Sequence, residues 1–297
     1  MILDLERHKP MIVVTGATGI LNGATVEHLL KRVPAETIGV SARDTMRAQH
    51  FADRGVRVRT GSYDDPITLR RSFDGAEQVL LVSSSDHTAD VLAQHRNAIE
   101  AAVAAGAQRI LYTSLHGADF EGTYPALGMH AATEAMLAES GVAWTSLRNG
   151  FFGDLNMLLG PWQDTGVISM PADGPIPWVD RADAGEAAAA VLAADRRFDG
   201  PVSIAPSETV SLADFAVAAS ELTGRTIERV VVDDEQWVGD QVTSGVPESV
   251  ARFTLSMFQA TRTGYFADGG ALLTELLGRQ PRSAAEQLAD TLIEPPT

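Results

Sequence analysis

The sequence predicts an α/β fold built on a doubly wound parallel sheet, and three observations predict it. The first half alternates short apolar runs with helix-like segments, a rhythm typical of βαβ units with helices on both faces of a sheet. Two of the runs, VLLV at 79–82 and ILY at 110–112, are apolar without alternation, as buried central strands are. The first run leads through glycines directly into a helix-like segment.

The elements of the first half follow in order from these patterns. Strands are expected at 11–15, 37–41, 56–59, 79–83, 109–113 and 143–147. Helices are expected at 24–33, 45–54, 66–73, 88–105 and 126–140.

The regular alternation of strand-like and helix-like segments ends after about residue 150. The stretch 151–180 is rich in Gly, Pro and aromatic residues, which indicates loops around a pocket. We then expect strands at 201–205 and 226–232 and helices at 182–195, 211–223, 234–244, 247–262 and 283–292. This organisation predicts a dinucleotide-binding domain of 1–153 with 176–206. A smaller α/β C-terminal region of 154–175 with 207–297 would cap the substrate over the carboxyl ends of the strands.

Composition excludes several classes of function. The 297 residues carry a formal charge of −16, which disfavours nucleic acid and anionic membrane surfaces as partners. The chain has no cysteine, so disulfides, thiolate catalysis and cysteine-ligated metals are excluded, and its histidines lack metal-ligand spacing. The N-terminal stretch is charged where a secretory signal would be apolar, and no run is long enough to span a membrane. We therefore expect a cytoplasmic protein without a metal site.

A phosphate-binding corner is predicted at MIVVTGATGILNG, residues 11–23. Glycines at a strand-to-helix turn let the backbone approach a pyrophosphate, and the helix start offers free N–H groups to the anion. The glycines fall at 16, 19 and 23, so Asn22 occupies the position of an expected third glycine. We expect its side chain to crowd the helix against the strand and weaken cofactor binding. The alternative is a glycine turn that binds no ligand.

The end of the second strand favours NADP(H) over NAD(H). A sheet that binds NAD usually has a carboxylate here for the ribose hydroxyls. This chain has Ser41 and then Arg43, with Arg47 one helical turn later, and two guanidinium groups can converge on a 2′-phosphate. Asp44 would repel that phosphate, and we expect it to cap the following helix. In the alternative interpretation both arginines are solvated surface cations.

Seven phrases spread along the chain resemble one known family. They are TGATG at 15–19, VPA at 33–35, the pair Arg43 and Arg47, QHRN at 94–97, AAGAQRILYTS at 104–114, LRNGFF at 147–152 and RADAGEAAAA at 181–190. The chain resembles the NmrA-like branch of the atypical short-chain dehydrogenases/reductases, within which NADPH-dependent quinone oxidoreductases and triphenylmethane reductases are most similar. The resemblance implies a Rossmann-type sheet that binds NADP(H).

The resemblance also implies cofactor-binding residues. The pyrophosphate turn would comprise Gly16, Thr18, Gly19, Ile20 and Leu21, and the 2′-phosphate would meet Arg43 and Arg47. Ser62 and Tyr63 would border the adenine; Ser83, Ser84 and Ser85 would lie beside the nicotinamide ribose, and Thr113 near the nicotinamide.

The residues at the position of the catalytic acid–base pair differ from those of most short-chain reductases. Where those have Tyr-x-x-x-Lys, this chain reads His130-Ala131-Ala132-Thr133-Glu134. Reduction of a simple ketone produces a basic alkoxide and needs a positioned acid, whereas a quinone or cationic dye takes hydride into a delocalised system. The candidate catalytic residues are His130 and Ser114. Alternatively, His130 caps or packs a helix start, and Glu134 is a structural first-turn carboxylate.

Candidate substrate contacts follow the fifth and sixth strands: His116, Tyr124, Asn149, Phe151 and Phe152. Phe151, Phe152, Trp162 and Trp178 would form a lid for a planar ring, or else an ordinary core. Arg148 is expected to pair with Asp154 or Asp183.

The leading hypothesis is an NADPH-dependent oxidoreductase that passes hydride to a planar acceptor, a quinone or similar conjugated molecule, without flavin or metal. A non-catalytic NADP-binding redox sensor fits the missing tyrosine and lysine equally well. A third alternative is that Asn22 has abolished dinucleotide binding, in which case Asn22→Gly should tighten it. The oligomeric state stays open, with a homodimer as one arrangement.

Overall fold

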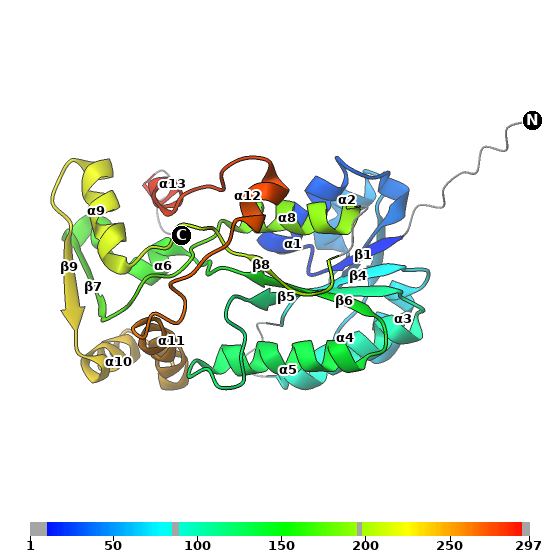
Figure 1. Cartoon of the computed structure of the whole chain (residues 1–297), viewed down its shortest axis with the longest axis horizontal. Coiled ribbons are helices and arrows are strands. Elements are labelled where there is room, and N and C mark those ends of the chain that lie inside the picture. Colours follow the sequence, from blue (N-terminus) through cyan, green and yellow to red (C-terminus); the bar gives the residue numbers. More distant parts are fainter. Residues whose placement is uncertain (1–10, 85–88, 195–197, 293–297) are drawn as a thin grey trace, which may run out of the picture. The chain divides into compact units, whose positions relative to one another are not determined.

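The computed structural model describes residues 11–84, 89–194 and 198–292, drawn in Figure 1. They divide into two compact units. Unit 1 holds the described residues up to Thr113 together with Ala132–Leu147 and Gly185–Val202. Unit 2 holds Ser114–Ala131, Arg148–Ala184 and the described residues from Ser203 on. The domain limits expected from the sequence stay a prediction.

A seven-stranded sheet in the order β3-β2-β1-β4-β5-β6-β8 organises the first unit. The strands are β1 (Ile12–Thr15), β2 (Ile38–Ala42), β3 (Arg57–Thr60), β4 (Gln78–Leu81), β5 (Arg109–Leu115), β6 (Ala143–Asn149) and β8 (Gly200–Ile204). The four pairings from β3 to β5 are parallel, with Ile12 beside Ile38 and Gln78. This confirms the doubly wound α/β fold, because the order reverses between β1 and β4.

Helices cover both faces of this sheet (Figure 1). One face carries α1 (Ile20–Leu29), α2 (Gln49–Ala52) and α8 (Arg181–Ala193); the other carries α3 (Pro66–Phe73), α4 (Val91–Ala104) and α5 (Pro125–Glu139). Their apolar sides and the central strands form a core around Val79, Ile110 and Tyr112, all with no exposed surface. Helix α3 begins where its sequence indicates, because Asp65 accepts from the N–H groups of Ile67 and Thr68, and Pro66 needs no partner.

The second unit is built on a two-stranded parallel sheet of β7 (Val167–Pro171) and β9 (Glu228–Val232), in which Val167 lies beside Glu228. Its helices are α6 (Leu155–Leu159), α7 (Trp162–Thr165), α9 (Leu212–Thr223), α10 (Asp234–Thr243), α11 (Glu248–Thr261), α12 (Leu272–Leu277) and α13 (Ala284–Asp290). Helix α9 starts after Ser211 as expected, through a reciprocal capping box with Asp214.

Four differences from the sequence expectations need correction. Helix α1 starts at Ile20 rather than 24, because the chain turns helical directly after Gly19. The expected helix at 45–54 is a 3₁₀ turn (Met46–Ala48) followed by the short α2. The stretch 151–180 contains α6, α7 and β7 rather than loops alone, and α12 was not expected. Within the described residues, no helix is both long and apolar enough to span a bilayer.

Candidate cofactor-binding site

A cavity of about 700 Å³ lies in unit 1, at the carboxyl ends of β1, β2, β3 and β4. Nine residues expected to bind cofactor line it: Gly16, Thr18, Gly19, Arg43, Arg47, Ser62, Tyr63, Ser83 and Ser84. Ile20, Leu21 and Thr113 are not among its lining residues, and Ser85 lies outside the described residues. The carboxyl ends of parallel strands meet at one edge, so the pattern of the sequence brings these side chains together.

Seven further residues line the cavity that the sequence did not indicate as ligands: Thr15, Ser41, Asp44, Gly61, Asp64, Val82 and Gln94. Gln94 comes from α4, and its side-chain amide donates to the Asp64 carboxylate at 2.9 Å. It belongs to the QHRN phrase, which was the only signal in the sequence that could have indicated it.

The glycine turn is a tight turn whose backbone lines the cavity. Gly16 has φ +66°, and a Cβ atom there would lie 2.6 Å from Val82 Cγ1, so the position admits glycine alone. Gly19 is the N-cap of α1, without a side-chain cap, and the first turn of α1 has no acidic residue. The N–H groups and the positive end of the helix dipole are therefore available to an anion at this edge of the cavity.

Asn22 does not crowd the helix away from the strand as the sequence suggested. Its side chain is buried at 1% exposure, its amide donates to the Thr15 carbonyl at 2.7 Å, and it is absent from the cavity lining. The tight contacts fall elsewhere: a Cβ atom on Gly23 would lie 3.1 Å from the Ala17 carbonyl oxygen, and one on Gly185 would lie 2.5 Å from that of Leu21. Asn22 thus ties α1 to β1 by a hydrogen bond and leaves the phosphate corner open.

Replacing Asn22 with glycine is expected to destabilise the protein by about 1.5 kcal/mol and to leave cofactor affinity no tighter. About 1 kcal/mol of this loss comes from the buried hydrogen bond, and a few tenths come from replacing asparagine by glycine in a helix. Urea unfolding measures it. Ala24→Gly is the control for glycine in the same helix: it removes no side-chain hydrogen bond and should cost about 1 kcal/mol. A loss of only a few tenths of a kcal/mol in Asn22→Gly would mean that the Asn22 amide does not stabilise the contact between α1 and β1.

The two arginines after β2 line the same cavity as the glycine turn, and both are exposed. Asp44 lies between them in sequence, and its Oδ1 accepts from the Met46 N–H at 2.9 Å. This bond forms a turn just before the 3₁₀ helix Met46–Ala48, but the N-cap of that helix is Thr45 and it has no side-chain cap, so the N-cap role expected for Asp44 is wrong. Two flexible cations and one carboxylate engaged by the backbone make this end of the cavity suited to a phosphate monoester.

His95 is held neutral inside unit 1. Its ring is 2% exposed, Nε2 accepts from the Ser84 N–H at 2.9 Å, and Nδ1 lies 2.9 Å from Thr133 Oγ1. Because Nε2 is an acceptor, the ring proton resides on Nδ1 and is donated to Thr133. Burial lowers the pKa of His95 to about 4.

The free energy of unfolding should therefore decrease as the pH is lowered, because of His95. Above pH 6.5 neither the folded nor the unfolded state protonates this residue; between pH 6.5 and about 4 only the unfolded state does, so acid favours unfolding. The expected loss from pH 7 to pH 4 is about 3 kcal/mol. Urea unfolding at several pH values measures it against His95→Gln, whose profile should be flatter by that amount. Parallel profiles for the two proteins would refute the assignment.

Unit 2 holds the residues expected to contact the substrate or to take part in proton transfer. Asn149 Nδ2 donates to the Ser114 carbonyl at 3.3 Å, and the His116 N–H donates to the Asn149 carbonyl at 2.7 Å. His116 Nε2 lies 3.2 Å from Asp268 Oδ1. The structure thus brings Ser114, His116 and Asn149 together, with a carboxylate beside the imidazole. His130 is buried and lies in the second turn of α5, not at the helix start.

The aromatic residues of unit 2 divide into core and surface. Phe151, Trp162 and Trp178 are buried in its core, and Phe151 meets Phe266 edge to face at 4.8 Å. Phe152 is exposed, with the Arg181 guanidinium 5.1 Å from its ring centre. The first three match the alternative of an ordinary core rather than a lid.

Four other residues singled out in the sequence analysis make contacts that the sequence did not indicate. Tyr124 packs against Phe253 with ring centres 5.2 Å apart, and burial raises its pKa to about 12. Asp154 caps α6, and buried Asp183 accepts from the Arg279 guanidinium at 2.7 Å and from the Arg282 N–H. The pairing of Arg148 with one of these two carboxylates stays a prediction. In unit 1, Glu134 is mid-helix rather than in the first turn, and accepts from Ser146 Oγ at 2.6 Å.

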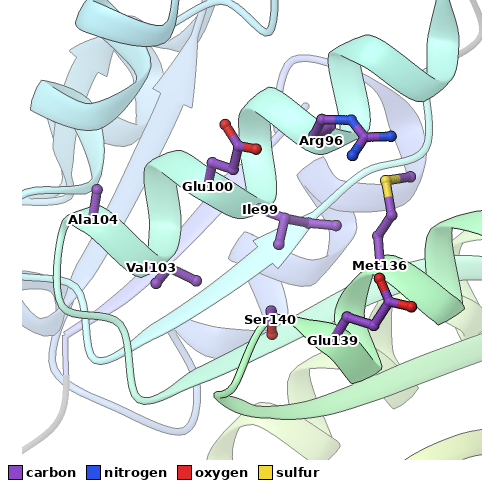
Figure 2. Close-up of a pocket in the computed structure, with 8 residues that line it drawn as sticks. All are labelled: Arg96, Ile99, Glu100, Val103, Ala104, Met136, Glu139 and Ser140. Atoms are coloured by element: carbon purple, nitrogen blue, oxygen red, sulfur yellow. The ribbon is translucent and has the colours of Figure 1, made fainter.

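A separate hollow of about 360 Å³ lies between α4 and α5 (Figure 2). Apolar side chains of both helices, Ile99, Val103 and Met136, line it, with Arg96 and Glu139 among its charged residues. None of the residues expected to bind cofactor or substrate is among those that line it.

Comparison with known proteins gives consistent matches over nearly the whole chain. The sequence model of the NmrA-like family matches residues 8–287. Quinone oxidoreductase 2 of Escherichia coli (strain K12) is 34% identical over 285 residues, covering 94% of this chain and 98% of the relative.

Two solved structures share the fold closely. NADPH-dependent quinone oxidoreductase QOR2 of Escherichia coli, complexed with NADPH, has a TM-score of 0.88 and 31% identity over 95% of this chain and 100% of that one. Triphenylmethane reductase of Citrobacter sp., complexed with NADP(H), has a TM-score of 0.86 and 29% identity over 94% of this chain and 99% of that one.

Proposed function

Because the chain belongs to the NmrA-like family, we propose that it is an NADPH-dependent oxidoreductase that reduces a quinone or a similar planar, conjugated acceptor. The observation that carries the proposal is one cavity lined by both a glycine turn and two arginines, at the carboxyl ends of four strands. The names of the similar proteins, a quinone oxidoreductase and a triphenylmethane reductase, support this acceptor class. When bound, the reduced nicotinamide supplies the hydride.

The residues of the cavity fit this cofactor in chemistry as well as in space. Gly16, Thr18 and Gly19 would hold the pyrophosphate, because a Cβ atom at Gly16 has no room and the first turn of α1 lacks a competing carboxylate. Arg43 and Arg47 would hold the 2′-phosphate by charge-assisted hydrogen bonds.

The residues of unit 2 would orient the acceptor and manage its proton. His116 would contact the acceptor, with the largely exposed Asp268 carboxylate 3.2 Å from its Nε2. Ser114 and Asn149 would contribute polar contacts near it. A strong, buried acid is not required for a quinone, whose reduced oxygen is far less basic than an alkoxide. His130 and Ser114 are the proposed catalytic residues, and His116, Asn149 and Phe152 are the proposed substrate contacts. Phe151 lies in the core of unit 2 and Tyr124 packs against that core, so these two are assigned structural roles.

Two measurements on the purified full chain test the proposal. Calorimetric titration with NADPH measures binding, and loss of reduced-nicotinamide absorbance on adding a benzoquinone measures turnover. We expect saturable binding and acceptor-dependent turnover that persists with a metal chelator and without added flavin. Tight binding without turnover on any quinone or cationic dye would replace the proposal by a redox sensor. Absence of binding at millimolar NADPH would overturn both.

A further inference from the structure

The segment that follows β4, Val82–Ser84, has its backbone held by side chains from four other parts of unit 1. Thr15 Oγ1 accepts from the Val82 N–H at 2.9 Å, and Tyr63 donates its hydroxyl proton to the Val82 carbonyl at 2.9 Å. We call Val82–Ser84 the post-β4 segment. It lines the candidate cofactor cavity.

The next two N–H groups of this segment are held in the same way. Thr113 Oγ1 accepts from the Ser83 N–H at 2.8 Å, and His95 Nε2 accepts from the Ser84 N–H at 2.9 Å. Sheet pairing does not supply these bonds, because β4 ends at Leu81. Three hydroxyl groups and one imidazole therefore determine where the backbone of the post-β4 segment lies.

The segment is packed against the glycine turn with no spare room. Val82 is the residue whose side chain leaves no space for a Cβ atom on Gly16. A shift of the segment would therefore change the width of the cavity at the point where the glycine turn lines it. Thr113, expected from the sequence to lie near the nicotinamide, accepts with its hydroxyl oxygen from the Ser83 N–H.

We propose that His95 is a positioning residue of the cofactor site: it does not line the cavity, and acts by fixing the Ser84 N–H and with it the post-β4 segment. This inference rests on the proposed binding of NADPH in that cavity. Imidazole suits the task because its two nitrogens are coupled. Thr133 accepts the proton from Nδ1, which leaves Nε2 with the lone pair that the Ser84 N–H requires.

The ring is also fixed in orientation by its aromatic neighbours. Tyr63 and Tyr112 meet it edge-on, with ring centres 6.4 Å and 5.3 Å away. The Tyr112 hydroxyl is bonded to Ser83 Oγ at 3.2 Å, so the same cluster contacts the segment twice. An imidazole held at both nitrogens and on two edges cannot turn away from Ser84 without breaking several contacts.

Two amide variants of His95 test the proposal. The shorter amide of His95→Asn reaches the place of Nδ1 but not Ser84, whereas the longer amide of His95→Gln extends to the place of Nε2. We expect the Kd for NADPH to rise roughly tenfold in His95→Asn, the equivalent of one lost buried hydrogen bond, and to stay within about threefold in His95→Gln. Amide hydrogen exchange of a peptide covering the post-β4 segment, measured without cofactor, should accelerate only in His95→Asn.

Thr133→Val provides a second route to the same result. It removes the acceptor for the Nδ1 proton, so the ring can carry its proton on Nε2, which then cannot accept from the Ser84 N–H. NADPH binding should weaken as a result, although Thr133 does not line the cavity. Ser146→Ala is the matched control: it removes a buried hydroxyl that bonds Glu134, so it should lower stability without changing the Kd.

Three results would overturn the inference. The first is wild-type affinity in both His95→Asn and Thr133→Val. The second is an equal loss of affinity in His95→Asn and His95→Gln. The third is unchanged exchange of the post-β4 segment in His95→Asn. Failure of the wild-type protein itself to bind NADPH would instead remove the proposed function, and accelerated exchange in His95→Asn would then retain the structural part alone.

Discussion

Gly16→Ala is expected to weaken NADPH binding at least about 100-fold. The alanine would have to adopt φ +66°, and its methyl group would lie 2.6 Å from Val82 Cγ1. Both the turn and the post-β4 segment line the cavity, so one of them must move into or away from the space proposed for the pyrophosphate. Calorimetric titration with NADPH measures the effect.

Gly106→Ala separates backbone strain from the contact with Val82. Gly106 also has a left-handed backbone, φ +86°, but no atom lies within 4 Å of the added Cβ. It should cost about 1–2 kcal/mol in stability and leave the Kd for NADPH unchanged. If Gly16→Ala bound NADPH as tightly as Gly106→Ala does, the glycine turn would not be the phosphate site.

Replacing Arg43 and Arg47 together by alanine is expected to raise the Kd for NADPH about 100-fold and to leave the Kd for NADH within about threefold. The two cofactors differ only in the 2′-phosphate, and these arginines line the cavity where it would bind. Each charge-assisted hydrogen bond contributes on the order of 1.5–3 kcal/mol, so even one lost bond is detectable. Binding of both cofactors to both proteins measures the change.

Arg70→Ala controls for the loss of positive charge from a strongly acidic protein. Arg70 is an exposed residue of α3 that does not line the cavity. Its removal should affect neither cofactor by more than about twofold. A parallel loss of NADH and NADPH affinity in the double variant would mean that the arginines attract the cofactor generally and do not recognise the 2′-phosphate.

The parts of the fold that depend on local pattern could be predicted from the sequence. Most strands of the seven-stranded sheet are recognisable as short apolar runs, whereas β3 (RVRT) alternates polar and apolar residues. Asp65-Pro66 and Ser211 mark helix starts by their capping chemistry. The glycine turn and the arginines after β2 were recognisable because each lies within a few residues of its strand.

The features that depend on distant partners could not be predicted. Strand β7 lies in a stretch rich in glycine, proline and aromatics, and its partner β9 begins about sixty residues later, with Val167 beside Glu228. Asn22 was expected to hinder cofactor binding because it stands where the sequence pattern has a glycine. Only the structure shows that its side-chain amide donates to the Thr15 carbonyl. His95 bonds Ser84 and Thr133, residues on either side of it that share no motif with it.

The division of the chain into interleaved segments bears on its synthesis. Unit 1 needs Gly185–Val202 to complete its sheet with β8, and unit 2 begins at Ser114 and continues to the last described residues. A ribosome must therefore release more than two thirds of the chain before the first sheet has all its strands. Until then the neighbouring edge of β6 lacks its partner strand, so its backbone N–H and C=O groups are open to pairing with another chain.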